Sequence, residues 1–271
     1  LNLFLRKIKM KKQTITSLVV LGAFMLAHFG KSYILKALNI SRDHWTLSGY
    51  TLYMAIFYVL IPAVVVGALH GWRNVLRELG WQDSFSKGFA FALVCTLPML
   101  IGYALVFEST QVPFKKLLIN LYTGSFWAGL GEETLYRAFL FGQLYRHGKW
   151  PFVGAVLVQA LVFGSAHLYQ AHDWVQAAGV FGVTFAGALW FAWLWIEWDN
   201  LWVNVWLHIL MNAWWACFEV SSNALGGVWA NVFRAVTIAI SVILTLRYLR
   251  KQGRKPLQKD VNFVPVREEI H

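Results

Sequence analysis

The segment Gly131-Glu132-Glu133-Thr134-Leu135-Tyr136-Arg137 lies in the middle of an otherwise apolar stretch of the chain. It places two carboxylates and a guanidinium group where the flanking residues indicate a lipid-spanning helix. Ionisable groups at that depth are costly, so they mark a candidate functional site. Two later apolar segments carry isolated polar residues of the same kind, namely His167 on one and His208 with Asn212 on the other. Together these residues are the parts of a hydrolytic site.

The composition indicates a polytopic membrane protein. Of the 271 residues, 58% are hydrophobic and 17% aromatic, and only 14% are charged, against about 25% in soluble domains. The length allows one compact bundle and no large soluble domain. The net charge of +11 comes from basic residues near the ends and in short loops. This distribution favours anionic lipid headgroups as the partner and argues against nucleic acid.

The apolar runs, compared with a span of about 20 residues, predict an all-α transmembrane bundle of about eight helices. Three regions follow from the same runs: a basic N-terminal segment over 1–13, the helical bundle over 14–249 and a polar tail over 250–271. Met10 is a more natural start than Leu1, so the first nine residues are interpreted as a gene-start artefact. The expected helices cover residues 14–36, 49–69, 88–107, 115–146, 151–171, 175–196, 201–220 and 227–249.

Lys/Arg-rich flanks alternate with flanks that are poor in Lys and Arg. The rich flanks are Arg6–Lys12, Arg73–Lys87, Arg146–Lys149 and Arg247–Lys259. With eight spans all four lie on one side of the membrane, and the positive-inside rule makes that side the cytoplasm. Both termini are therefore expected in the cytoplasm.

Helix geometry relates the polar residues to one another. Residues four apart share a helix face, so Glu133 and Arg137 can form an ion pair, whereas Glu132 points about 100° away. His208 and Asn212 are also four apart. At about 1.5 Å of rise per residue, Glu132, His167 and Asn212 lie at similar depths, so the three spans can converge on one site.

These residues suffice for water-driven amide hydrolysis. A carboxylate in a low-dielectric pocket can act as general base on a water, and a neighbouring histidine can hold that water or pass a proton to the leaving amine. His208 and the Asn212 amide can donate hydrogen bonds to a developing oxyanion. Ser165 lies two residues before His167, on another face, and is interpreted as a packing residue.

The series Glu-Glu-x-x-x-Arg, Phe-x-x-x-His and His-x-x-x-Asn on successive spans resembles the CAAX-processing and bacteriocin-processing (CPBP) family of glutamic intramembrane proteases. The resemblance covers residues from about 129 to 212. It implies that Glu132 activates the water with help from His167, while His208 and Asn212 form the oxyanion hole. It also implies that Glu133 and Arg137 support the site. The expected protein is a multi-pass endopeptidase of the bacterial plasma membrane, without a cofactor, that cleaves a peptide or membrane-protein substrate.

Other interpretations stay open at this point. A zinc peptidase could use Glu132, His167 and His208 as ligands, although the sequence lacks His-Glu-x-x-His. A transporter or a non-catalytic scaffold is a third class, but no internal repeat of the kind common in transporters is visible. Within any of these, Glu133 and Arg137 could be a purely structural pair. The sequence does not choose among prenylated CAAX proteins, bacteriocin leaders and other sorting signals as substrates.

Overall fold

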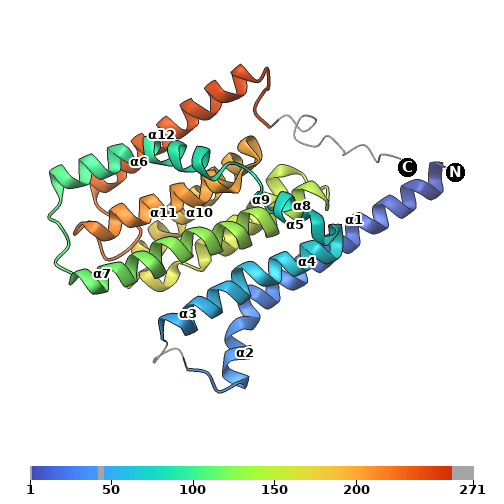
Figure 1. Cartoon of the computed structure of the whole chain (residues 1–271), viewed down its shortest axis with the longest axis horizontal. Coiled ribbons are helices and arrows are strands. Elements are labelled where there is room, and N and C mark those ends of the chain that lie inside the picture. The colour runs from blue at the N-terminus through green and yellow to red at the C-terminus, as the bar shows by residue number, and fades with distance from the viewer. Residues whose placement is uncertain (1, 42–45, 258–271) are drawn as a thin grey trace.

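The computed structural model describes residues 2–41 and 46–257 as a bundle of long helices, and no strand occurs among these residues (Figure 1). The predicted all-α class is confirmed. The tail expected over 250–271 lies largely outside the described residues. At the other end of the chain, helix begins at Asn2, within the segment that the sequence assigned to a separate basic N-terminus.

Eight helical rods make up the described part of the chain, several of them built from consecutive helices. Single helices form four of them: α6 (Phe85–Val106), α10 (Trp174–Trp198), α11 (Leu201–Cys217) and α12 (Val228–Lys251). The composite rods are α1–η1–α2 (Asn2–Met25, Leu26–Gly30, Lys31–Ala37), α3–η2–α4 (Leu47–Met54, Ala55–Leu60, Ile61–His70), α7–η4–α8 (Phe114–Asn120, Leu121–Phe141, Gly142–Arg146) and α9 (Phe152–Ser165) with the 3₁₀ turn η5 (Leu168–Gln170). Between α4 and α6 lie the short helices η3 (Trp72–Asn74) and α5 (Val75–Glu78).

Side-chain caps fix where several of these helices begin. The side chains of Thr46, Ser84 and Asp173 each accept a hydrogen bond from a backbone N–H in the first turn of α3, α6 and α10. Such caps satisfy amide groups that have no partner inside the helix. Asn200 caps α11 in the same way, directly after Asp199 ends α10 in the left-handed conformation. The tight turn at Asp199 and Asn200 therefore sets α10 and α11 antiparallel.

Six of the rods are long and apolar enough to cross a membrane. The two others are the α7–η4–α8 rod, which carries the acidic pair, and α11, which has 17 residues. These two pack against each other, and α11 also packs along α6. The two rods that differ from a lipid-facing span are therefore in the interior of the bundle, where the polar residues meet protein instead of lipid.

The span expected over 151–171 agrees with the candidate span Phe152–Gln170, but the α-helix within it, α9, ends at Ser165. The seventh helix ends at Cys217 instead of residue 220. At the end of α9 the His167 amide bonds to the Gly164 carbonyl, and the His167 ring donates from Nδ1 to the Phe163 carbonyl at 2.7 Å. The side chain thus takes the carbonyl that a further helical turn would have used. His167 consequently lies in the turn between α9 and η5, near one end of the candidate span Phe152–Gln170.

Polar contacts tie the loops together at each end of the bundle. At the end that holds Met10 and Lys251, which we call the basic end, Arg146 pairs with Asp199, His147 bonds Glu78 at 2.7 Å, and Arg254 lies 3.7 Å from Glu197. The loops at 107–113, 166–173 and 218–227 lie at the opposite end, which we call the far end, and backbone hydrogen bonds join the first of them to the third.

The orientation of the bundle in the membrane follows from its charges. We expect the basic end to face the cytoplasm, because Lys and Arg concentrate there. Reporter fusions after residues 78, 148 and 255 should then give a cytoplasmic signal, and fusions after residues 110, 172 and 223 the opposite one. An outside signal at residue 255 would contradict this topology and reverse the face to which the far end opens.

Candidate active site

The helix that carries the acidic pair runs without a break from Phe114 to Arg146, and it is wound as a π-helix over Leu121–Phe141. Gly129 lets α11 approach this helix closely. A Cβ at Gly129 would lie 2.5 Å from Ile209 Cγ1 and 3.0 Å from the Val205 carbonyl oxygen, so a larger residue would push α11 away. The close approach brings His208 of α11 beside both glutamates.

Glu133 is fully buried and is held by one cation and two hydrogen-bond donors. Its Oε1 lies 3.2 Å from the guanidinium of Arg137 and 2.8 Å from His208 Nδ1, and its Oε2 accepts a 3.4 Å hydrogen bond from Asn204. The ion pair expected from the four-residue spacing is therefore present. The Arg137 guanidinium is also buried, 4.1 Å from the Phe163 ring centroid. Glu133 thus links η4, α11 and, through Arg137, α9.

The contact with Glu133 determines how His208 presents its second nitrogen. An ionised carboxylate can only accept hydrogen bonds, so Nδ1 of His208 carries the proton. Nε2 then faces Glu132, with 3.9 Å between it and Glu132 Oε2. His208 can donate to an oxyanion from Nε2 only when that nitrogen is also protonated. The sequence interpretation did not include this condition, because it did not place Glu133 behind the imidazole.

Glu132 lies in a different environment from its neighbour. Its side chain is 22% exposed, whereas that of Glu133 is 0% exposed. Its Oε2 atom is buried but has no hydrogen-bond partner among the described residues. Glu132 is therefore the carboxylate of the pair that can accept a proton or a hydrogen bond from a reactant.

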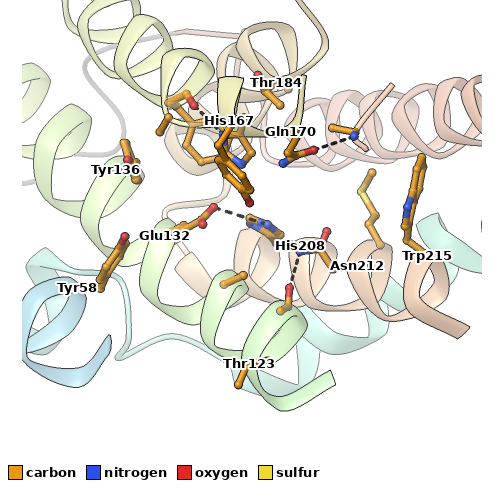
Figure 2. Close-up of a pocket in the computed structure, with 18 of the residues that line it drawn as sticks. Tyr58, Thr123, Glu132, Tyr136, His167, Gln170, Thr184, His208, Asn212 and Trp215 are labelled. Carbon is orange, nitrogen blue, oxygen red and sulfur yellow. Dashed lines mark hydrogen bonds and ion pairs between the residues drawn. The ribbon is translucent and has the colours of Figure 1, made fainter. Parts of the chain in front are cut away.

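His167 and Asn212 complete the set of residues expected at the site. In Figure 2 the side chains of Glu132, His167 and His208 point into one space, with Asn212 beside His208. Since Nδ1 of His167 donates to a carbonyl, its Nε2 is an acceptor. Asn212 donates from Nδ2 to the Gly124 carbonyl at 2.9 Å, which ties α11 to η4. The four residues predicted to be catalytic all line one cavity.

This cavity has a volume of about 940 Å³. In Figure 2 it extends from Tyr58 and Tyr136 at one side, past Glu132 and His208, to Gln170 and Trp215 at the other. Residues of the loop at 218–227 also line it, so it reaches the far end of the bundle. This volume lies in the upper part of the range of ligand-binding pockets.

The sequence interpretation missed several polar residues of the site. Asn204 stands four residues before His208, so the polar series Asn204, His208 and Asn212 at helical spacing on an apolar helix was a usable signal. Lys31 and Arg234, two cations inside apolar runs, also line the cavity. Tyr58 gave no signal, because a tyrosine in an apolar span is ordinary.

The described residues include no group of three His, Cys, Asp or Glu side chains placed to hold one metal ion. The zinc set considered from the sequence, Glu132, His167 and His208, is therefore not assembled in this conformation. That the reaction proceeds without a metal stays a prediction.

Comparison with known proteins gives one match. The family model described as Rce1-like, type II CAAX prenyl endopeptidase, matches residues 114–214, a little more than a third of the chain. The matched stretch contains both glutamates, His167, His208 and Asn212. No curated protein and no solved structure matches the chain.

The buried pair leads to a stability prediction. Arg137→Ala should lower the free energy of unfolding by about 3–5 kcal/mol, because it leaves Glu133 as a buried charge without its cation. Thermal unfolding of the purified protein in detergent would measure this as a lower Tm. The matched control is Arg247→Ala, which removes an exposed arginine on α12 and should change Tm little.

A double variant separates the charge effect from lost packing. Glu133→Gln combined with Arg137→Ala removes the stranded charge and should recover part of the loss. An Arg137→Ala protein as stable as the parent would show that the pair contributes nothing to stability.

Proposed function

We propose that this chain, a member of the CPBP family of CAAX-type proteases, hydrolyses a peptide bond with a water that Glu132 activates. The observation that carries the proposal is the Glu132 carboxylate, which lies in the cavity with one oxygen buried and without a hydrogen-bond partner in the part of the chain that the structure describes. His208 Nε2 lies 3.9 Å from that oxygen.

The different surroundings of the two glutamates support this assignment of roles. Glu133 is already paired with Arg137 and accepts hydrogen bonds from His208 and Asn204. Glu132 has no such donors at its buried oxygen. Neighbouring carboxylates whose environments differ in this way commonly divide acid–base and supporting roles between them. We therefore assign proton transfer to Glu132 and the supporting role to Glu133.

The proposed reaction begins with a water held by Glu132 and by the acceptor nitrogen of His167. Glu132 takes a proton from the water while the water oxygen attacks the carbonyl carbon of the substrate. The proton then passes to His208 Nε2, and the resulting imidazolium is stabilised by Glu133 at its other nitrogen, as a carboxylate behind an imidazole does in hydrolases. Collapse of the tetrahedral intermediate breaks the C–N bond, and the leaving amine receives this proton.

Negative charge develops on the substrate carbonyl oxygen during the attack. The Asn212 amide has a second N–H beyond the one used by Gly124 and can donate it throughout the attack. His208, one helical turn away, can donate Nε2–H to the tetrahedral intermediate after it has received the proton and before that proton passes to the leaving amine. These two groups are the proposed oxyanion hole. Arg137 supports the site through Glu133 and does not take part in the proton transfers.

The proposed substrate is a peptide or protein anchored at the membrane, because the cavity lies within a bundle of membrane-spanning helices. The matched family is described as a type II CAAX prenyl endopeptidase, and we take a lipid-anchored or leader-bearing peptide as the substrate class here. With both termini in the cytoplasm of a bacterial cell, the cavity would open on the outer side of the plasma membrane. Anionic lipids would contact the basic end, and no cofactor or nucleic acid is required.

The role of Glu132 is tested by Glu132→Gln. We expect peptide cleavage to fall by about 10²–10⁴, the contribution of a general base, because the amide cannot take the proton. Cleavage of membrane-peptide substrates by protein in detergent or vesicles would measure the rate. Glu108→Gln, an exposed residue of a far-end loop, is the matched control. Full activity of Glu132→Gln would remove the proposed base.

The oxyanion hole is tested by Asn212→Ala. The kcat should fall by about 10²–10³, by analogy with a single lost oxyanion donor, while KM should change little because the interaction strengthens in the transition state. Since Asn212 also bonds the Gly124 carbonyl, Tm is measured alongside, and exposed Asn120 provides the control variant Asn120→Ala. A rise in KM with unchanged kcat would instead place Asn212 in ground-state binding.

The same assay addresses the metal alternative. A strong chelator should leave cleavage intact, and the purified protein should contain less than stoichiometric zinc. Stoichiometric zinc that disappears in His208→Ala, together with reversible inactivation by the chelator, would replace this mechanism by a zinc-dependent one.

A further inference from the structure

Arg234, like Lys31, lines the cavity but lies outside the matched residues. Arg234 is on α12, in a helix long and apolar enough to span the membrane. A charged side chain in such a helix is costly unless it has a partner or a function. The proposed hydrolysis does not use Arg234, so its presence there needs its own explanation.

Arg234 is held in a fixed orientation by its neighbours. One guanidinium nitrogen donates to Asn231 Oδ1 at 2.9 Å and another to the Ala224 carbonyl at 3.0 Å. The guanidinium carbon lies 5.0 Å from the centroid of the Trp215 ring. A guanidinium group has five N–H donors, so these two hydrogen bonds orient the planar group and leave further donors available.

Three arginines that are more deeply buried show what is missing at Arg234. Arg137, Arg146 and Arg254 have side chains at most 10% exposed, and each pairs with a carboxylate: Glu133, Asp199 and Glu197 respectively. Arg234 is half-buried, and its contacts within the described part of the chain are to neutral groups, without an ion pair. An oriented arginine without a carboxylate on the wall of a cavity is suited to receive one from a ligand.

The position of Trp215 places this arginine relative to the proposed chemistry. Trp215 is three residues after Asn212 on α11, about 4.5 Å farther along the helix. In Figure 2 Trp215 and Gln170 lie at the opposite side of the cavity from Tyr58 and Tyr136. A group bound at Arg234 would therefore lie within a few residues of the bond held at Glu132.

We propose that Arg234, backed by Trp215, is a specificity subsite that binds a carboxylate of the substrate, from either an acidic side chain or a free C-terminus. The proposal rests on the proposed function in that the ligand is taken to be a peptide substrate. It adds a requirement for a negative charge near the scissile bond, set by a residue of α12 that the matched stretch does not contain.

The test uses matched pools of random-sequence decapeptides with the full-length protein in detergent. One pool contains Asp and Glu, and its matched pool contains Asn and Gln at the same positions. Each of the two pools is made once with a free C-terminus and once with an amidated C-terminus. The first readout is retention of the peptides on immobilised Glu132→Gln protein, which measures binding without cleavage. The second is mass-spectrometric mapping of the bonds that the unmodified protein cuts.

We expect carboxylate-bearing peptides to be retained about tenfold better than their amide counterparts, the effect of one charge-assisted hydrogen bond. Adding Arg234→Gln should abolish this preference, and Arg234→Lys should keep only part of it, because lysine retains the charge but not the planar fork. Arg247→Gln, on the same helix but exposed, should leave the preference unchanged. If Arg234→Gln does not fold, the loss is read from Arg234→Lys.

The arms distinguish the source of the carboxylate and separate this proposal from the proposed function. A preference only among pools with free C-termini assigns the terminus, and one that persists after amidation assigns acidic side chains. An Arg234-dependent preference in binding without cleavage of any pool supports the subsite and contradicts the protease. No preference, or one unchanged in Arg234→Gln, overturns the subsite. The subsite is also overturned if the protein in detergent shows no preference for carboxylate-bearing peptides but binds phosphatidylglycerol in a way that depends on Arg234. That result would make Arg234 a lipid contact.

Discussion

The carboxylate of Glu133 organises the interior of this protein. It is fully buried and joins a guanidinium on its own helix to an imidazole and an amide on α11. Removing any one partner would leave a buried charge less well compensated, and a loss of this kind costs far more than the net value of the pair. The geometry of the site follows, because His208 can meet Glu133 only while α11 lies against Gly129. One buried anion therefore sets the distance between the two helices and the orientation of the imidazole.

Two adjacent glutamates consequently have unlike properties. They differ by one position on a helix, and that step turns one side chain into the protein interior and the other into a large cavity. The polar contacts around Glu133 are complete, whereas those of Glu132 are not. An incomplete set of hydrogen bonds in a polar cavity is what a reaction needs, since the missing partners can be supplied by a water and a substrate. The same reasoning distinguishes Arg234 from the three arginines that already have carboxylates.

The sequence sufficed for the class and for the pairing of Glu133 with Arg137. Its eight expected spans correspond to eight rods in the described part of the chain, of which six are long and apolar enough to cross a membrane. These depend on short-range regularities, namely apolar runs and a four-residue spacing. It also named four residues that the structure brings to one cavity, although their roles stay proposals. It did not reveal that Glu133 stands behind His208, because that contact joins residues 75 apart. It also carried the fifth helix past Ser165, because a side chain that takes over a backbone carbonyl is not visible in hydropathy.

The composition of the two central rods has a consequence for how the protein is made. The α7–η4–α8 rod carries three buried ionisable groups, and α11 is shorter than a typical span. A segment that enters the bilayer alone must be hydrophobic enough for its insertion to be favourable. Each charged residue at its centre raises the free energy of insertion by about 2.5–3.5 kcal/mol. In these two rods the polar groups are surrounded by neighbouring helices instead of lipid, so insertion of the rods is coupled to assembly of the bundle. The residues of the candidate site that they carry would then come together only in a finished molecule, and a partly synthesised chain would hold no assembled site in the membrane.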